Sequence, residues 1–326
     1  MRSFKHIHAR TVDEACALLW KYNGKARLNA GGTDLLSILK GEILIDYPEA
    51  IINIKEIPGL DGVKEDNGVL RIGALTKLSD ITKSLFPKQE YRILAEAAHS
   101  VATPQIRNAA TLGGNLCQDV RCCYYRYPRL IGGPIRCLRK GSGPCLAVSG
   151  DNRYHAILEG KGCFAVCPSD TAVALAALDA QIKIASPKGD RRTAVTDFFG
   201  TVGNILKRGE MITEIEVPAI PGTVKQMFLK FTLRTPVDFA IVSVAVVTVL
   251  EKGVCTDARV VLGAVAPRPI RAKEAEEVIK GRPVDQDVAA EAAEQAVAKA
   301  KPLSMNAYKI EIAKALLRKA MLAEIR

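Results

Sequence analysis

Two short loops, each containing a pair of adjacent glycines, constrain this 326-residue chain more than any other feature. The loops are Ala30-Gly31-Gly32-Thr33-Asp34-Leu35 and Thr111-Leu112-Gly113-Gly114-Asn115-Leu116. Glycine tolerates positive φ and lets the backbone approach a ligand closely, and consecutive free N–H groups form a concavity that binds anions. Neither loop is the G-x-G-x-x-G fingerprint or a Walker loop. A single Gly-Gly pair is most often a plain turn, but two such loops can hold the two halves of a pyrophosphate.

The first half of the chain is expected to alternate helices and strands. Thr11 and Glu14 have the spacing of a capping box, which predicts a helix that ends near Gly24. A short apolar strand at 27–30 leads into the first glycine loop, and a helix begins at 35–39. Hydrophobic periodicity further predicts strands at 50–54, 69–72 and 181–185 and helices at 91–100 and 171–180.

The second half of the chain has a different order of predicted elements. Strands are expected at 227–233, 239–250 and 258–265, followed by helices at 272–280, 286–301 and 306–325. Strands followed by a run of helices indicate a separate α+β domain. Pro218, Pro221 and Gly222 mark the expected boundary.

Composition excludes two classes of partner. The net charge is +11, but basic residues are scattered among acidic ones and aromatic residues make up only 5%, so we predict no nucleic-acid binding. The basic surface is either simply solvated or a docking face for an acidic electron-transfer protein. The longest apolar stretch, 239–250, is shorter than the roughly twenty residues of a membrane span. The N-terminus lacks the apolar core of a secretory signal, and we expect a cytoplasmic protein.

Cysteine is concentrated in one stretch. Seven of the nine cysteines lie between 117 and 167, namely Cys117, Cys122, Cys123, Cys137, Cys145, Cys163 and Cys167. In a cytosolic chain stable disulfides are rare, so such clustering indicates metal or redox chemistry.

At this point the sequence resembles a known family. The segments that carry this resemblance are the two loops, Arg71–Thr76, Gln105–Asn108, Pro168–Asp170, and Lys230 and Arg234 ahead of Asp238–Ala240. Together they resemble the flavoprotein subunit of the xanthine dehydrogenase and carbon monoxide dehydrogenase family. The resemblance covers essentially the whole chain. It implies an α+β protein whose FAD-binding fold has two α/β subdomains, 1–55 and 56–218, followed by a C-terminal α+β domain, 223–326.

The resemblance also implies which residues bind FAD. The first loop and the residues before it would line the pyrophosphate, as would the second loop. Val101 would lie against the flavin ring, Asp170 would bond its ribityl chain or ring edge, Ile212 would contact the adenine side and Lys230 would reach the isoalloxazine. The complete set is Leu28, Asn29, Ala30, Gly31, Gly32, Thr33, Asp34, Leu35, Val101, Thr111, Leu112, Gly113, Gly114, Asn115, Asp170, Ile212 and Lys230.

The cysteine-rich stretch is an insert relative to simple members of this family. It resembles the insert in the corresponding subunits of 4-hydroxybenzoyl-CoA reductases, where four cysteines ligate a 4Fe–4S cluster. That resemblance assigns Cys122, Cys137, Cys145 and Cys163 as ligands, with Cys123 and Cys167 as candidates to replace one of them. Glycines in the insert would let it wrap a cluster. A zinc site and unliganded thiols are the alternatives, although paired C-x-x-C knuckles are absent.

No Ser/His/Asp set or paired-carboxylate arrangement stands out, so we expect an electron carrier without catalytic residues of its own. By resemblance, a large molybdopterin-binding subunit and a small subunit with 2Fe–2S clusters would be separate chains, and ferredoxin or another soluble carrier would exchange electrons with the insert. The complex would be an aryl-CoA reductase or a xanthine or carbon monoxide dehydrogenase-like oxidising enzyme. The remaining alternative is a stand-alone flavin reductase with a structural zinc.

Overall fold

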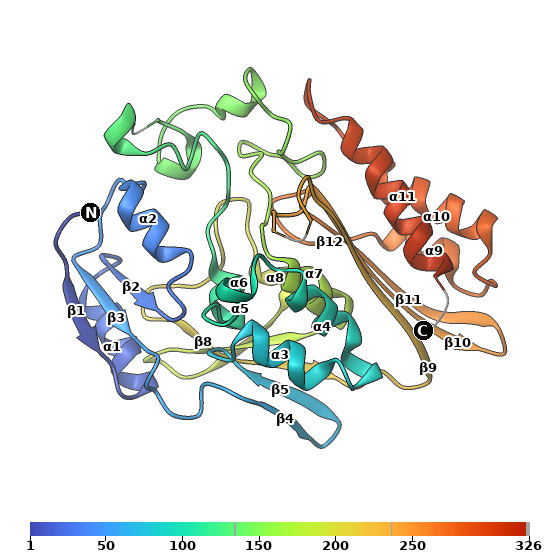
Figure 1. Cartoon of the computed structure of the whole chain (residues 1–326), viewed down its shortest axis with the longest axis horizontal. Helices are drawn as coiled ribbons and strands as arrows, with labels where there is room; N and C mark the ends of the chain where they lie inside the picture. Colours follow the sequence, from blue (N-terminus) through green and yellow to red (C-terminus); the bar gives the residue numbers. More distant parts are fainter. Residues whose placement is uncertain (134, 236, 324–326) are drawn as a thin grey trace.

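The first subdomain is a small parallel sheet with helices beside it. The computed structural model describes residues 1–133, 135–235 and 237–323. Strands β1 (Lys5–His8), β2 (Ala26–Asn29) and β3 (Ala50–Asn53) pair in the order β1-β3-β2, and both pairings are parallel. Helix α1 (Val12–Lys21) connects β1 to β2, and α2 (Leu35–Gly41) follows β2 (Figure 1). The first glycine loop is therefore the turn from β2 into α2.

Helix α1 begins where the capping pattern predicts. The Thr11 hydroxyl accepts a hydrogen bond from the Glu14 N–H at 3.1 Å. The Glu14 carboxylate accepts from the N–H of Arg10, one residue earlier than in a standard capping box, at 2.8 Å. Lys21 is its last residue, a little before the glycine that was expected to end it.

The second subdomain is built on a five-stranded sheet. Its strands are β4 (Val63–Asp66), β5 (Val69–Gly73), β6 (Gln181–Ala185), β7 (Arg191–Ala194) and β8 (Met211–Pro218), in the order β4-β5-β8-β6-β7. Every pairing is antiparallel, so this subdomain is α+β and differs from the α/β alternation expected for it. Its helices are α3 (Leu78–Leu85), α4 (Arg92–His99), α5 (Pro104–Arg107), α6 (Leu112–Cys117), α7 (Asp170–Ala177) and α8 (Val195–Phe198).

The C-terminal domain is a four-stranded antiparallel sheet with three helices. The sheet has the order β12-β11-β10-β9, formed by β9 (Thr223–Phe231), β10 (Val242–Glu251), β11 (Val254–Gly263) and β12 (Ile270–Arg271). Helices α9 (Lys273–Ile279), α10 (Gln286–Val297) and α11 (Tyr308–Leu322) follow. Alternate residues of β10 explain its apolar run from Val244 to Val247: Val244 and Val246 pack against these helices, whereas Ala245 and Val247 join the core around α7. Both faces of the strand are buried.

The cysteine-rich insert lies between the first subdomain and the C-terminal helices (Figure 1). In its described residues it is mostly irregular, with short 3-10 turns, and it runs above the sheets between α2 and the C-terminal helices (Figure 1). The Asn152 side chain donates to Ser304 and accepts from the N–H of Met305. Asn306 and Lys309 donate to the backbone carbonyl of His155 at 3.2 and 3.1 Å. These buried contacts fix the far half of the insert to the start of α11.

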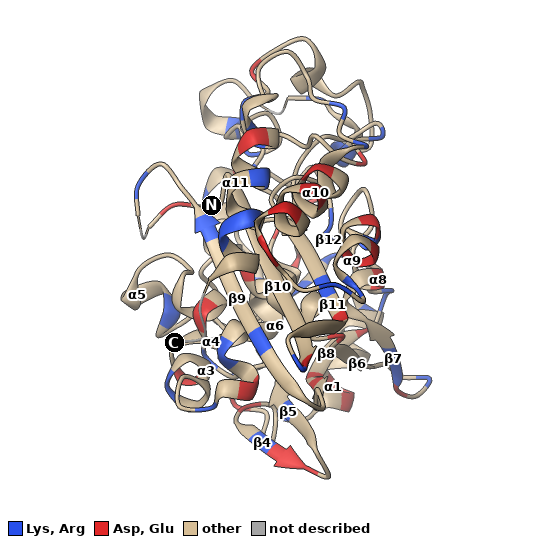
Figure 2. Cartoon of the chain, turned by 90° about the vertical axis from the view of Figure 1, so that its right-hand side faces the viewer, with Lys and Arg blue, Asp and Glu red and all other residues tan. Residues whose placement is uncertain are grey.

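The distribution of charged residues and the lengths of the helices can be described directly. On the face that shows β9–β12 and α9–α11, basic and acidic positions are interspersed (Figure 2). Among the described residues, no helix is both long enough and apolar enough to cross a membrane.

Candidate cofactor cavity and cysteine insert

A large cavity lies where the first two subdomains, the start of the insert and the C-terminal domain meet. Its volume is about 850 Å³. Both glycine loops line it, together with Val101, Asp170, Lys230 and the segment 117–121. We call it the main cavity.

The first glycine loop offers free backbone donors to the main cavity. Within the described part of the chain, the N–H groups of Gly31, Gly32, Thr33 and Asp34 make no hydrogen bond. Gly32 has a φ of +71°, which favours glycine. A Cβ on Gly31 would lie 2.1 Å from the carbonyl oxygen of Ala109, so this glycine lets the first loop pack directly on the backbone before the second. Free consecutive amides are suited to binding phosphate.

The second glycine loop differs from the expectation that it also presents free amides. The N–H groups of Leu112 and Gly113 donate to backbone carbonyls of the 74–76 segment at 2.9 and 2.8 Å. Those of Gly114 and Asn115 donate to the side chain and carbonyl of Thr111, which caps α6. This loop therefore supports the cavity wall through a fixed backbone, while the first loop supplies the open donors.

Arginine 107 holds a strained turn in the same wall. Ala102 has a φ of +45°, a conformation that costs free energy for a residue with a Cβ. The buried Arg107 guanidinium donates to the carbonyls of Val101 and Ala102, both at 2.9 Å. Arg107 thus fixes the predicted flavin-facing residue Val101 at the cavity.

A buried ion pair joins the α7 end of the cavity to the C-terminal sheet. Lys230 Nζ lies 2.7 Å from Asp170 Oδ2, and the two side chains are 8% and 6% exposed. Lys230 also donates to the carbonyl of Ser100 at 2.9 Å. Burial raises the pKa of Asp170, and the neighbouring ammonium opposes that shift. Asn115 accepts hydrogen bonds from Ser169 and from Thr171, both at 2.6 Å, and so holds the residues on either side of Asp170.

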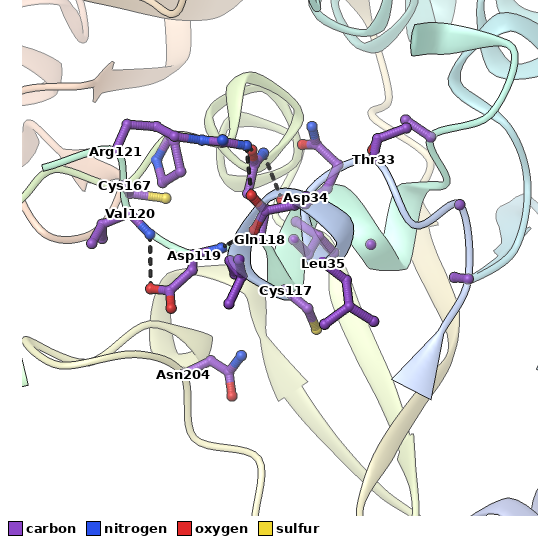
Figure 3. Close-up of a pocket in the computed structure, with 18 of the residues that line it drawn as sticks. Thr33, Asp34, Leu35, Cys117, Gln118, Asp119, Val120, Arg121, Cys167 and Asn204 are labelled. Carbon is purple, nitrogen blue, oxygen red and sulfur yellow. Dashed lines mark hydrogen bonds and ion pairs between the residues drawn. The ribbon is translucent and has the colours of Figure 1, made fainter. Parts of the chain in front are cut away.

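The carboxylate of Asp34 ties the first glycine loop to the insert. It lies 2.9 Å from Arg121 and 2.8 Å from Arg126, and it accepts from the N–H of Asp119 (Figure 3). Arg121 also lies over the Phe239 ring, 4.4 Å from its centroid. Burial, with the nearby Arg126 adding to it and Asp34 opposing it, lowers the pKa of Arg121 to about 10. The Asp34 side chain therefore positions protein groups, while its backbone N–H stays available for the predicted pyrophosphate contact.

Most of the predicted cofactor residues meet at the main cavity. Its lining includes Leu28, Ala30, Gly31, Gly32, Thr33, Asp34, Leu35, Val101, Thr111, Gly114, Asn115, Asp170 and Lys230. Asn29, Leu112, Gly113 and Ile212 are not part of the lining. Ile212 lies on β8 in the central core, so its assignment to the adenine side stays a prediction. Two residues were missed as site residues: Arg121, which lines the cavity, and Arg107, which supports the turn at Val101 and Ala102 from behind the lining.

The four cysteines assigned as cluster ligands gather around one small cavity. Cys122, Cys137, Cys145 and Cys163 all line it, and we call it the cysteine cavity. The two competing candidates lie elsewhere: Cys167 lines the main cavity, as does Cys117, which was not assigned to the cluster, and Cys123 is exposed. In the described residues, no three His, Cys, Asp or Glu side chains are close enough to hold a single metal ion.

Two buried side chains, Lys140 and His155, lie beside the assigned cysteines. The Lys140 side chain has an unpartnered ammonium and lies over the Tyr125 ring, which also lines the cysteine cavity. Burial lowers the pKa of Lys140, and the neighbouring Cys137 and Cys122 oppose that shift. His155 Nε2 lies 3.3 Å from Cys122 Sγ. The site thus combines four thiols with an uncompensated cation.

Comparison with known families covers nearly the whole chain. The family described as "FAD binding domain in molybdopterin dehydrogenase" matches residues 2–220. The family described as "CO dehydrogenase flavoprotein C-terminal domain" matches residues 228–323. The boundary between the matches falls at the turn between β8 and β9.

Individual relatives agree with the family match. The aldehyde oxidoreductase FAD-binding subunit PaoB of Escherichia coli is 33% identical over 100% of this chain and 99% of its own length. The carbon monoxide dehydrogenase medium chain of Hydrogenophaga pseudoflava is 29% identical over 92% of this chain and 88% of its own. A solved carbon monoxide dehydrogenase from the same organism superposes with a TM-score of 0.79, at 26% identity and with 98% and 96% coverage. The chain therefore belongs to the family of FAD-binding subunits of molybdenum hydroxylase-type dehydrogenases.

Proposed function

We propose that this chain carries electrons between an iron–sulfur partner subunit and an external carrier, using FAD in the main cavity and a 4Fe–4S cluster in the insert. One observation carries the proposal: a single cavity joins the free amides of the first glycine loop to the buried Asp170–Lys230 pair. FAD, when bound, accepts two electrons and releases them one at a time, so it couples one-electron centres to a two-electron donor or acceptor.

The residues present fit FAD. The N–H groups of Gly31 to Asp34 would hold the pyrophosphate, because they are consecutive donors without protein partners. Val101, fixed by Arg107, would pack on the flavin ring. Lys230 would supply positive charge to the ring while its partner Asp170 keeps it oriented. The chain itself binds and orients the cofactor and shields it from water.

The donor set of the insert fits a thiolate-ligated cluster better than a single ion. Iron–sulfur clusters are held by four cysteine thiolates, and a multi-iron cluster keeps its ligands further apart than one metal ion does. Four cysteines line the cysteine cavity, but within the described parts of the chain no three ligands are gathered tightly enough for a single ion. The unpartnered Lys140 ammonium would offset the negative charge of such a cluster.

We assign the substrate chemistry to partner chains. By analogy with the relatives that are medium chains of larger enzymes, the partners would be a large molybdopterin-binding subunit and a small subunit with 2Fe–2S clusters. The full-length similarity to an aldehyde oxidoreductase subunit favours an aldehyde as the substrate and outward electron flow. An aryl-CoA reductase of the 4-hydroxybenzoyl-CoA type, in which electrons run inward to the substrate, is the second candidate and rests on the insert alone.

The co-purified complex tests this proposal. We expect molybdenum, FAD and more iron than two 2Fe–2S clusters provide, with mass spectrometry finding two further subunits. Adding an aldehyde substrate to the oxidised complex should bleach the flavin absorbance. If the second candidate is correct, aryl-CoA thioesters should instead reoxidise a chemically reduced complex. A colourless chain, or a yellow chain that contains zinc and no partners, would refute the electron-transfer assignment.

A further inference from the structure

A second cavity adjoins both the main cavity and the cysteine cavity. Its volume is about 370 Å³. It shares Cys122 with the cysteine cavity. It also shares Cys167, Pro168, Asp170 and Phe239 with the main cavity. A molecule held here would therefore lie beside both proposed redox sites.

The walls of the second cavity are suited to a neutral, flat ligand. Apolar surface predominates, supplied among others by Pro168, Ala240, Ile241 and Ala264. The volume is within the range of pockets that hold small molecules and accommodates one or two fused rings.

Every charged side chain in this lining already has a partner of opposite charge. Arg121 pairs with Asp34. The three lining aspartates, Asp151, Asp170 and Asp238, pair with Arg153, Lys230 and Arg234, each at 2.7 Å. These pairings leave little net charge in the lining to recognise a phosphate or a carboxylate, although Asp34 is shared between Arg121 and Arg126, so the lining disfavours highly charged dinucleotides and CoA esters.

Three buried polar atoms in the lining have no hydrogen-bond partner among the described residues, namely Ser243 Oγ, His155 Nδ1 and Arg121 Nε, and the first two belong to almost fully buried residues. Ser243 is 1% exposed and its hydroxyl makes no hydrogen bond, and His155 is 4% exposed and its Nδ1 makes none. A Cβ on Gly263 would lie 2.3 Å from Ser243 Oγ, so the missing side chain there leaves room for the hydroxyl. An unsatisfied buried polar atom is costly, which indicates that a ligand oxygen completes these bonds.

We propose that the second cavity binds a quinone-class electron acceptor between the flavin and the cysteine insert. A quinone is flat, neutral and apolar, and it carries carbonyl oxygens. The Ser243 hydroxyl can donate to a carbonyl and accept from a hydroxyl, so it matches both the quinone and its hydroquinone. Reduction takes up two electrons, which the substrate-reduced complex supplies, and two protons from solvent. The inference rests on the proposed electron-transfer function and adds the chemical class of the external acceptor.

Menadione binding to the oxidised, intact complex is the direct test. Calorimetry should show saturable binding of menadione and much weaker binding of 2-methylnaphthalene, which has the same rings without the oxygens. Ser243→Val should weaken menadione binding about three- to ten-fold, the effect of one neutral hydrogen bond, and leave 2-methylnaphthalene unchanged.

A blocking variant tests the position. Ala240 lines the second cavity but not the main one, so Ala240→Trp should abolish menadione binding while FAD and iron contents stay at wild-type levels. The exposed Val148 on the insert lines none of the three cavities, and Val148→Trp is the matched control with full binding. In stopped flow, Ala240→Trp should slow reoxidation of the dithionite-reduced complex by menadione but not by ferricyanide.

The outcomes separate the two proposals. A wild-type complex without flavin or iron refutes the electron-transfer function. A fully loaded complex that fails to bind menadione, or whose Ala240→Trp variant binds it as tightly as wild type, refutes the quinone site alone. Equal binding of menadione and 2-methylnaphthalene also overturns the assignment, because the oxygens would then play no part.

Discussion

Replacing Lys230 by methionine should destabilise the chain much more than the same change at the surface. The substitution removes the 2.7 Å ion pair with Asp170, whose side chain is 6% exposed, and the hydrogen bond to Ser100. An uncompensated buried charge typically costs about 3–5 kcal/mol. Lys25 pairs with Glu49 at 2.8 Å, but both side chains are 57% exposed, so solvent screens this pair and Lys25→Met should have little effect on stability.

The pH dependence of this loss identifies its cause. Burial already raises the pKa of Asp170, and without Lys230 nothing opposes that shift. The folded state then binds a proton that the unfolded state releases, so stability falls as pH rises above the unfolded value of about 3.9. The deficit of Lys230→Met relative to wild type should therefore be larger at pH 8 than at pH 5.

These quantities are measured by urea unfolding of the wild type, of the single variants Lys230→Met, Asp170→Asn and Lys25→Met, and of the double variant Lys230→Met/Asp170→Asn. The neutral amide should recover part of the loss, giving a coupling free energy of about 0.5–3 kcal/mol. The reasoning is refuted if Lys230→Met costs no more than Lys25→Met, or if the added Asp170→Asn recovers nothing.

Three further perturbations test the fold, the main cavity and the insert. Burial lowers the pKa of Lys309 to about 7, so wild-type stability should rise between pH 7 and 9 by up to about 1.4 kcal/mol per pH unit, and urea titrations of Lys309→Met should lack that share of the slope. Gly31→Ala should push the glycine loops apart and lower the FAD content at least ten-fold. Gly200→Ala should keep FAD, because a Cβ there meets only an ordinary contact at 3.8 Å. Equal FAD content in both variants would contradict the packing of the two loops. Cys137→Ser should lose the insert's iron and retain FAD while Cys123→Ser keeps both, and full iron in Cys137→Ser would reject the ligand assignment.

Local patterns predicted the regular elements well. The alternating strand 181–185 is β6 with the same bounds, and the helix predicted at 91–100 is α4 within a residue at each end. These segments succeed because their apolar period is set by the face they bury. Strand β8 was missed; Ile212 within it is buried in the central core, and its predicted contact with the adenine side stays a prediction.

The cavity required long-range information. The sequence identified the glycine loops but not their different roles, because the amides of the second loop are occupied by carbonyls of the 74–76 segment. The packing of Gly31 on Ala109 and the pairing of Asp34 with Arg121 join residues far apart in the chain. No local spacing signals such contacts, since only the completed fold creates them.

The FAD content of the purified, folded wild-type chain is the most direct test of the account. Released flavin should be identified as FAD by mass spectrometry, at one molecule per chain. A chain with native circular dichroism and a cooperative unfolding transition that neither contains FAD nor takes it up on incubation would contradict the central claim that the main cavity is a flavin site.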